Sequence, residues 1–242
     1  MSGPLRLILF DVDGTLVDSQ DDIVRAMELS FEALGLTPPK RLDITGIIGL
    51  SLEIAVVRLM PGLAEPLYED LVAGYKTAYQ GLRALNGTPQ SSPLYPKARD
   101  VLQSLWARPE YLLGVATGKS RRGLDILLDK HGLRDYFITA QFADLHPSKP
   151  HPSKPHLSKL HPAKPHPAML QAALAETGIA AKNAVMIGDT QFDMEMAGAA
   201  GVHAIGVTWG YHEVDRLVCA DYIANDFVQI PSILNTLWQE AA

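Results

Sequence analysis

Five short apolar runs separated by helical patterns constrain the fold of this chain more than any other feature. Continuous rather than alternating apolar residues are typical of strands that are covered on both faces. The runs are Leu5–Phe10, Leu112–Ala116, Phe137–Phe142, Ala184–Ile187 and Val202–Val207. The helical patterns are Lys97–Trp106, Arg121–Lys130, Ala168–Thr177 and Phe192–Ala200, and we expect glycines to end three of them, at Gly132, Gly178 and Gly201. This alternation predicts an α/β fold with a doubly wound, Rossmann-like parallel sheet.

The stretch between Gly14 and Lys97 interrupts the alternation, because a crossover between parallel strands needs only about a dozen residues. Its patterns are helical: one helix capped by Asp18 or Ser19 and running through Leu34 to Gly35, then Leu52–Leu59 and Glu65–Leu82. We therefore predict a small all-helical domain at residues 17–90, inserted into a core formed by residues 1–16 and 91–242. The prolines of the predicted return linker are Pro89, Pro93 and Pro96.

Residues 145–167 contain a repeat with a five-residue period, in which HPSKP recurs with small variations. This density of proline prevents a helix and favours an extended, polyproline-like ribbon. Five of the eight histidines lie here and could bind a metal. The interspersed lysines disfavour a preorganised metal site, so we interpret the segment as a flexible surface insert in the core.

The composition narrows the class of protein. A formal net charge of -6 argues against a protein that coats nucleic acid. The single Cys219 cannot form an internal disulfide, which fits a reducing compartment. No apolar stretch approaches the roughly 20 residues that span a bilayer, and the first residues lack a signal-peptide pattern. We expect a cytoplasmic protein, a monomer or a dimer, with no membrane or nucleic-acid partner.

Two carboxylates directly follow the first predicted strand, in the segment Asp11-Val12-Asp13-Gly14-Thr15. Ligands of open parallel sheets bind beyond the carboxyl ends of the strands, so both acids are expected to point into a site. The alternative is that Asp13 and Gly14 only form a turn, since Asp-Gly is a common turn pair.

Polar residues also follow the second and fourth strands. Thr117, Gly118 and Lys119 could cradle a phosphate, helped by the positive end of the following helix. Asp189 and Asp193 group carboxylate oxygens at the same edge, as Mg²⁺ requires. Each feature has a structural alternative: a turn for Thr-Gly, and helix capping or interaction with the helix dipole for the two acids.

Together, DVDGT, ATGK, KPHP and GDTQFD occur in this order along almost the whole chain. In this the sequence resembles the haloacid dehalogenase-type phosphatase superfamily. The helical insertion after the first motif is similar to that superfamily's first type of cap, C1. The nearest resemblance is to phosphoglycolate-phosphatase-like members, which share DGTLVDS and SKPHP.

The resemblance implies a role for each residue. Asp11 would be the nucleophile that becomes an aspartyl-phosphate, and Asp13 the general acid and then the general base. Mg²⁺ would be held by the side chains of Asp11 and Asp189 and the backbone carbonyl of Asp13, with support from Asp193. Thr117 and a lysine would bind the transferred phosphoryl group, with Gly118 and Lys119 next to it.

The identity of this lysine is open, because Lys149 and Lys164 both stand in a Lys-Pro-His-Pro motif. Lys149 has the expected distance from the third strand, whereas Lys164 leads directly into the helical pattern Ala168–Thr177. We favour Lys164, because the helix determines where its first residues lie while a proline-rich loop can bulge out before it.

The resemblance favours Mg²⁺-dependent hydrolysis of a small phosphate monoester, phosphoglycolate-like, over related activities. A sugar-phosphate mutase is disfavoured because Ile48 and Leu52 stand where such enzymes carry phosphate-binding charges. A dehalogenase is disfavoured because Asp13 provides a second acid. A catalytically impaired phosphate-binding or interaction protein is the other alternative. Three cations of the insertion could reach a substrate carboxylate, although such residues more often solvate helix faces: Arg58, Lys76 and Arg83.

Overall fold

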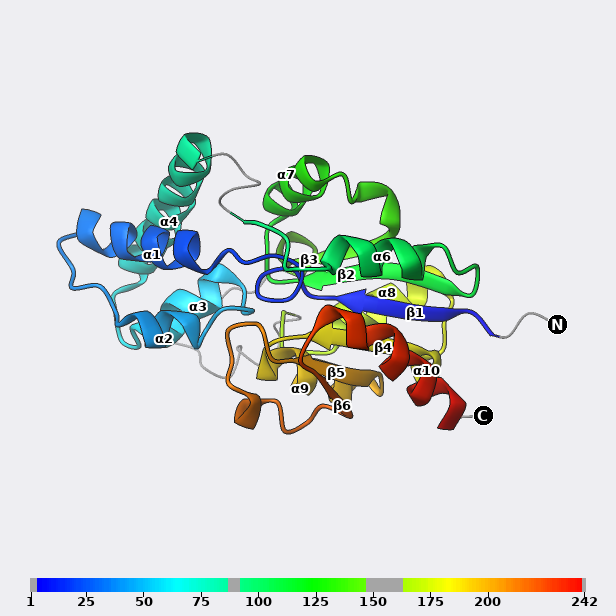
Figure 1. Ribbon diagram of the computed structural model, residues 1–242. Helices are drawn as coiled ribbons and strands as arrows, with labels where there is room; N and C mark the ends of the chain where they lie inside the picture. The colour runs from blue at the N-terminus through cyan, green and yellow to red at the C-terminus, as the bar shows by residue number, and fades with distance from the viewer. Residues whose placement is uncertain (1–3, 87–91, 147–162, 241–242) are drawn as a thin grey trace.

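A six-stranded parallel sheet forms the centre of the molecule (Figure 1). The computed structural model describes residues 4–86, 92–146 and 163–240. The strands are β1 Arg6–Phe10, β2 Tyr111–Thr117, β3 Phe137–Phe142, β4 Ala184–Gly188, β5 His203–Val207 and β6 Tyr222–Ala224. They pair in the order β3-β2-β1-β4-β5-β6, and every pairing is parallel. The strand order therefore reverses at β1 and β4, where open α/β sheets bind their ligands.

Helices cover both faces of the sheet and explain why the strand runs are continuously apolar. The core helices are α6 Ala98–Trp106, α7 Arg121–His131, α8 Ala168–Thr177, α9 Gln191–Ala200 and α10 Ile230–Glu240. Successive side chains of a strand point to opposite faces. Ile8 and Phe10 of β1 accordingly pack in the cluster that includes α6, α7 and α10. Leu7 and Leu9 pack with α8 and α9 on the other face.

The predicted strands and helices of the core agree with the structure to within about two residues at their ends. The three glycines expected to end helices have positive φ angles, of 59° at Gly132, 69° at Gly178 and 67° at Gly201. The prediction omitted β6, α10 and α2 (Arg41–Thr45). The three residues of β6 and the five of α2 are too short to carry a periodic signal.

The insertion after β1 is helical, as predicted, and has its own apolar core. It consists of α1 Gln20–Ala33, α2, α3 Leu52–Leu59 and α4 Glu65–Asn86, which extends beyond the predicted end at Leu82. Met27 and Phe31 of α1 pack with Leu71 of α4. In Figure 1 these helices lie beyond the end of the sheet that is opposite the two chain termini. The insertion therefore stands over the carboxyl ends of the strands, and we call it the cap.

Two chain segments join the cap to the core and run side by side. The amide of Asp18 donates to the carbonyl oxygen of Pro93 at 2.9 Å, and the amide of Tyr95 donates to that of Leu16 at 3.0 Å. Of the two predicted capping residues, Asp18 and Ser19, Ser19 is at the N-cap position, but its hydroxyl makes no capping bond and donates to Asp13 instead. The start of the cap is thus tied directly to a predicted catalytic residue.

Most of the histidine- and proline-rich segment, together with Lys149 and the linker residue Pro89, lies outside the described residues. The predicted ribbon is therefore not described. The described residues begin again at Ala163, which directly precedes Lys164 and lies shortly before α8. In the part of the chain that the structure describes, no helix is both long and apolar enough to cross a membrane.

Candidate active site

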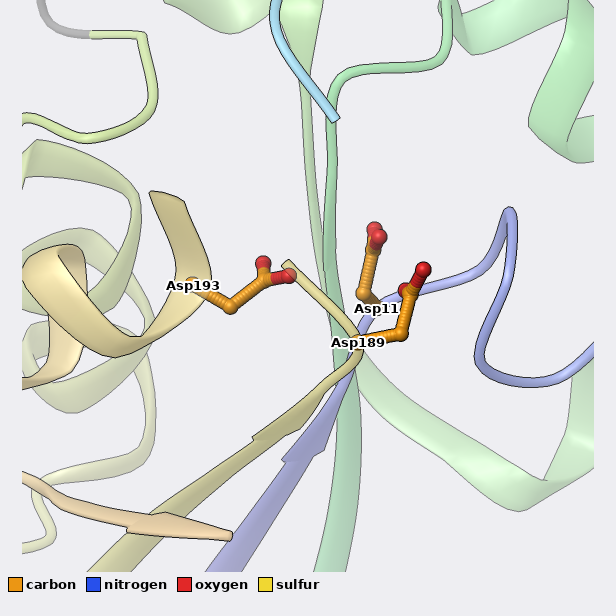
Figure 2. A group of neighbouring side chains, drawn as sticks. All are labelled: Asp11, Asp189 and Asp193. Carbon is orange, nitrogen blue, oxygen red and sulfur yellow. The ribbon is translucent and has the colours of Figure 1, made fainter. Parts of the chain in front are cut away.

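Three of the predicted acids converge where the strand order reverses. Asp11 follows β1, Asp189 follows the neighbouring β4, and Asp193 lies in the first turn of α9. Each offers one carboxylate oxygen, and these oxygens lie within 4.8 Å of one another. Figure 2 shows the three side chains around the ends of the two strands. The parallel pairing of β1 and β4 thus brings together residues that are far apart in the sequence.

Lys164 completes this group. It is fully buried, its Nζ lies 2.8 Å from Oδ1 of Asp11, and it donates to Oδ1 of Asp193 at 2.6 Å. Burial lowers the pKa of Lys164, but the carboxylates of Asp11 and Asp193 outweigh it and raise that pKa above its usual value. Of the two candidate lysines, Lys164 is the one that the structure describes, and it lies against the predicted nucleophile.

The charges and free acceptor atoms of this group fit a divalent cation. Three carboxylates and one ammonium leave a formal charge of two minus, which is costly in a buried site. Both carboxylate oxygens of Asp11 are buried: Oδ1 pairs with Nζ of Lys164 at 2.8 Å, and Oδ2 accepts no hydrogen bond from the residues that the structure describes. Burial is the main cause that raises the pKa of Asp11 to about 7, and a nearby cation would favour its ionised form. Oxygen donors of this kind are those that Mg²⁺ prefers.

Asp189 is held in place by the backbone around it. Its Oδ1 accepts a hydrogen bond from the hydroxyl of Thr15 at 2.8 Å, and its Oδ2 accepts one from the amide of Tyr211 at 2.9 Å. A Cβ atom on Gly14 or on Gly210 would lie 2.1 Å from Asp189. Gly14 also has a φ of +86°. Both glycines are therefore required for the chain to wrap this closely around the carboxylate.

Asp193 both caps the N-terminus of α9 and takes part in the group of charged residues. With Thr190 it forms a reciprocal capping box at the start of α9. Its Oδ2 accepts from the amide and the hydroxyl of Thr190 at 3.1 and 2.7 Å, while its Oδ1 accepts from Lys164. The capping alternative considered for Asp193 is thus correct, and the cap bond also orients the carboxylate toward Lys164.

Asp13 stands apart from the other acids and forms its own ion pair. Its Oδ1 accepts from Nζ of Lys119 at 2.7 Å and from the hydroxyl of Ser19. Burial alone would raise the pKa of Asp13, but the ammonium of Lys119 and these hydrogen bonds hold it below its ordinary value. Lys119, expected next to the substrate phosphate, therefore contacts the predicted acid–base residue.

Thr117 and Gly118 lie at the contact between core and cap. The buried Thr117 ends β2, and its hydroxyl accepts from the amide of Lys119 at 3.2 Å. A Cβ atom on Gly118 would lie 2.8 Å from the carbonyl oxygens of Gly49 and Leu50 in the cap. The glycine therefore allows the cap loop to approach the end of β2.

A cavity of about 650 Å³ separates the cap from the core at this point. Core residues Asp11, Asp13 and Thr117 line one side, and residues of α1, α4 and the loop before α3 line the other. Lys76 and Arg83, two of the three cap cations, also line it. Arg58 instead borders a separate pocket near Arg216, where its guanidinium lies 5.3 Å from the ring centre of Phe192.

Several residues that shape the site were not predicted as site residues: Thr15, Ser19, Thr190, Gly210 and Tyr211. The Thr-x-x-Asp spacing before α9 is a recognisable capping-box signal. The others act through contacts between segments distant in sequence, which leave no local pattern.

Comparison with known proteins agrees with this architecture. The family model of the haloacid dehalogenase-like hydrolases matches residues 5–201. A protein of Dickeya dadantii named "Probable phosphatase IndB" is 36% identical over 218 residues, which are 89% of this chain and 86% of that protein. The phosphoglycolate phosphatase of Nitrosococcus oceani is 32% identical over 95% of this chain and 96% of its own length.

A solved structure adds support from the fold. The haloacid dehalogenase-like family hydrolase from Streptococcus pneumoniae superimposes with a TM-score of 0.74 at 27% identity. The match covers 95% of this chain and 98% of that structure. The similarity therefore extends over the core and the cap together.

Proposed function

The chain belongs to the haloacid dehalogenase-like hydrolase family and is a phosphatase, and on this basis we propose that it hydrolyses a small phosphorylated metabolite similar to phosphoglycolate. The reaction would depend on Mg²⁺ and pass through a phosphoryl group carried by Asp11. In this proposal residues 17–90 are the cap that covers the site.

One observation carries the proposal: the buried group of Asp11, Asp189, Asp193 and Lys164 at the reversal of strand order. A formal charge of two minus would be neutralised by one Mg²⁺. Asp11 is the member of the group with a free acceptor atom among the described residues, its Oδ2, and it also lines the cavity. A carboxylate that faces the substrate pocket can attack a phosphorus atom.

In the first step an oxygen of Asp11 bonds to phosphorus while the bond between phosphorus and the substrate's alcohol oxygen breaks. Asp13 gives a proton to that oxygen, so the leaving group departs as a neutral alcohol. Thr117 and the backbone amide of Gly118 bind the phosphoryl oxygens, and Lys164 holds Asp11 in position. Mg²⁺, held by Asp11, Asp189 and the carbonyl of Asp13 with support from Asp193, would supply positive charge to the transferred group.

In the second step Asp13 removes a proton from a water molecule. The water oxygen bonds to phosphorus, the bond between phosphorus and Asp11 breaks, and phosphate is released. The ion pair between Asp13 and Lys119 affects the first step, because Asp13 must carry a proton to act as an acid and the ammonium of Lys119 favours its ionised form. A substrate anion that draws Lys119 away would allow Asp13 to take up that proton.

The direct test is phosphate release from a panel of small phosphate esters, phosphoglycolate included, with Mg²⁺ and with EDTA. We expect release that requires Mg²⁺ and is lost in EDTA. Release of equal rate in EDTA would refute the metal-dependent mechanism. Conversion of a sugar phosphate to its isomer without free phosphate would show a mutase instead.

A further inference from the structure

We propose that Arg83 of α4 recognises a carboxylate on the leaving group of the substrate, and that this contact makes the enzyme selective for acidic phosphate esters. The proposal rests on the phosphatase function given above and assigns its specificity to one cap residue. Arg83 lines the cavity between cap and core together with Asp11, Asp13 and Thr117.

The guanidinium of Arg83 has buried donors without partners. Its Nε and Nη2 are buried and make no hydrogen bond to any residue in the described ranges. The side chain as a whole is only partly buried and lines the cavity. Arginine is always charged and carries five N–H donors, so burying two donor atoms without acceptors is unfavourable. Native proteins seldom keep such groups unless a ligand or water satisfies them. The arrangement is therefore incomplete without an acceptor from outside the described chain.

Aromatic rings hold this guanidinium in place but accept no hydrogen bonds from its N–H groups. Its carbon lies 5.0 Å from the ring centre of Tyr79, and Tyr79 stacks on Tyr75 with ring centres 5.7 Å apart. A ring face attracts the positive charge but offers no acceptor to N–H groups in the guanidinium plane. Arg83 is thus oriented in advance, which reduces the entropy lost when an anion binds.

The other described cations on the cavity differ from Arg83. Lys119 is paired with Asp13 at 2.7 Å, and Lys76 with Glu53 at 3.3 Å. Arg122 is exposed, so water satisfies its donors. Arg83 is therefore the lining cation that combines buried donors with the lack of a partner in the described ranges.

The position of Arg83 corresponds to the leaving group rather than the phosphoryl group. Nζ of Lys119 lies 5.5 Å from the same Tyr79 ring and contacts Asp13, the proposed proton donor to the leaving oxygen. A substrate whose phosphate lies at Asp11 would extend past Asp13 and Lys119 toward Tyr79 and Arg83. The planar fork of a guanidinium matches a carboxylate with two parallel hydrogen bonds.

The test compares esters matched in length that differ in one carboxylate. The pairs are phosphoglycolate with ethyl phosphate, and 3-phosphooxypropanoate with propyl phosphate. We expect the wild-type protein to favour the acidic member of at least one pair. Arg83→Gln should lower kcat/KM for that member by about tenfold to a hundredfold, the value of one charged hydrogen-bond pair. It should change the neutral member little, and Arg83→Lys should retain part of the preference.

Arg122→Gln is the matched control, because it removes the same charge from an exposed position on the same cavity. The proposal is overturned if Arg83→Gln slows both members of each pair equally, if Arg122→Gln abolishes the preference as well, or if the wild type shows no preference. A wild-type protein that releases no phosphate from any ester of the panel would instead refute the proposed function itself.

Discussion

The two sides of the cavity are built in opposite ways. The acidic floor, formed by Asp11, Lys164, Asp189 and Asp193, is buried. Its carboxylate oxygens lie within 4.8 Å of one another, and Lys164 pairs with Asp11 and Asp193. The cap wall is formed by Tyr75, Tyr79 and Arg83 of α4. The two tyrosine rings stack and orient the guanidinium, but its buried Nε and Nη2 have no acceptor within the described part of the chain.

This difference between paired charges on the floor and unpaired donors on the wall corresponds to two separate tasks, catalysis and substrate recognition. Charges that are already oriented around the reacting atoms need no reorganisation during the reaction, so the floor suits any phosphate ester. Donors that are left free on the wall gain a partner only from a substrate that carries the right group. In the proposed function the floor would therefore define the reaction class, and the wall would define the substrate.

The largest effect is expected at the floor, from Asp11→Asn. The amide cannot act as the nucleophile, so phosphate release should fall by more than about 10⁴-fold. The variant should unfold at a temperature no lower than the wild type, because it removes one of three clustered negative charges. Phosphate release and a thermal melt measure both. Near-normal turnover would refute the role of Asp11.

Lys164→Met should reduce stability more than any comparable change on the wall. Removing the ammonium leaves Asp11 and Asp193 buried without their counter-charge, which costs about 3–5 kcal/mol of unfolding free energy. Urea denaturation at pH 8 in EDTA should show this loss, and Mg²⁺ should reduce it.

Lys76→Met is the matched control, because its pair with Glu53 is half exposed and such pairs contribute about 0–1 kcal/mol. If Lys164→Met and Lys76→Met destabilise the protein equally, the floor does not depend on its buried ion pairs.

Gly118→Ala tests the contact between the core and the cap loop that holds the two surfaces together. The added Cβ would lie 2.8 Å from two backbone carbonyl oxygens of the cap loop, so the cap must move outward. We expect kcat/KM to fall by a factor that corresponds to about 1–3 kcal/mol, with the fold retained. Gly81→Ala in α4 is the control, since nothing lies within 4 Å of its Cβ. Unchanged kinetics in Gly118→Ala would show that this contact does not position the cap.

The smallest effect is expected away from both surfaces, at His131. Nε2 of this buried side chain donates to the carbonyl oxygen of Ser92 in the linker that returns from the cap, at 2.9 Å. Burial lowers the pKa of His131 below its ordinary value of 6.5. Below pH 6.5 the unfolded chain therefore binds a proton that the folded chain does not, and stability should decrease as the pH falls.

His131→Gln removes this titration. Denaturation midpoints measured between pH 5 and 8 should fall less steeply toward acid in the variant than in the wild type. Identical slopes would mean that protonation of His131 does not contribute to acid destabilisation.

Much of the fold follows from local sequence patterns. The apolar runs of β1 through β5 and the glycines after α7, α8 and α9 correspond to structural elements because strand burial and helix termination depend on neighbouring residues. β6 was missed because three residues carry no period. The convergence of Asp11 with Asp189 was predictable, since parallel strands present their carboxyl ends at one edge.

Other parts of the site could not be predicted in this way. The sequence offered two equivalent Lys-Pro-His-Pro motifs, and the choice of Lys164 depended on the helix that follows it. The pairing of Lys119 with Asp13 was not predicted, because nothing in the spacing of these two residues indicates that contact. The three cap cations were indistinguishable in the sequence, because each is a charged residue on a helix.

The sequence by itself determined the reaction class, because the acids proposed to perform it follow directly on strands whose ends must meet. Tertiary structure alone decided which charges are paired and which are free. Arg58 lies outside the cavity, Lys76 is paired with Glu53, and two nitrogens of Arg83 are buried without an acceptor among the described residues. The physical reason is that burial and ion pairing depend on which distant segments pack together, and a local pattern does not record that packing.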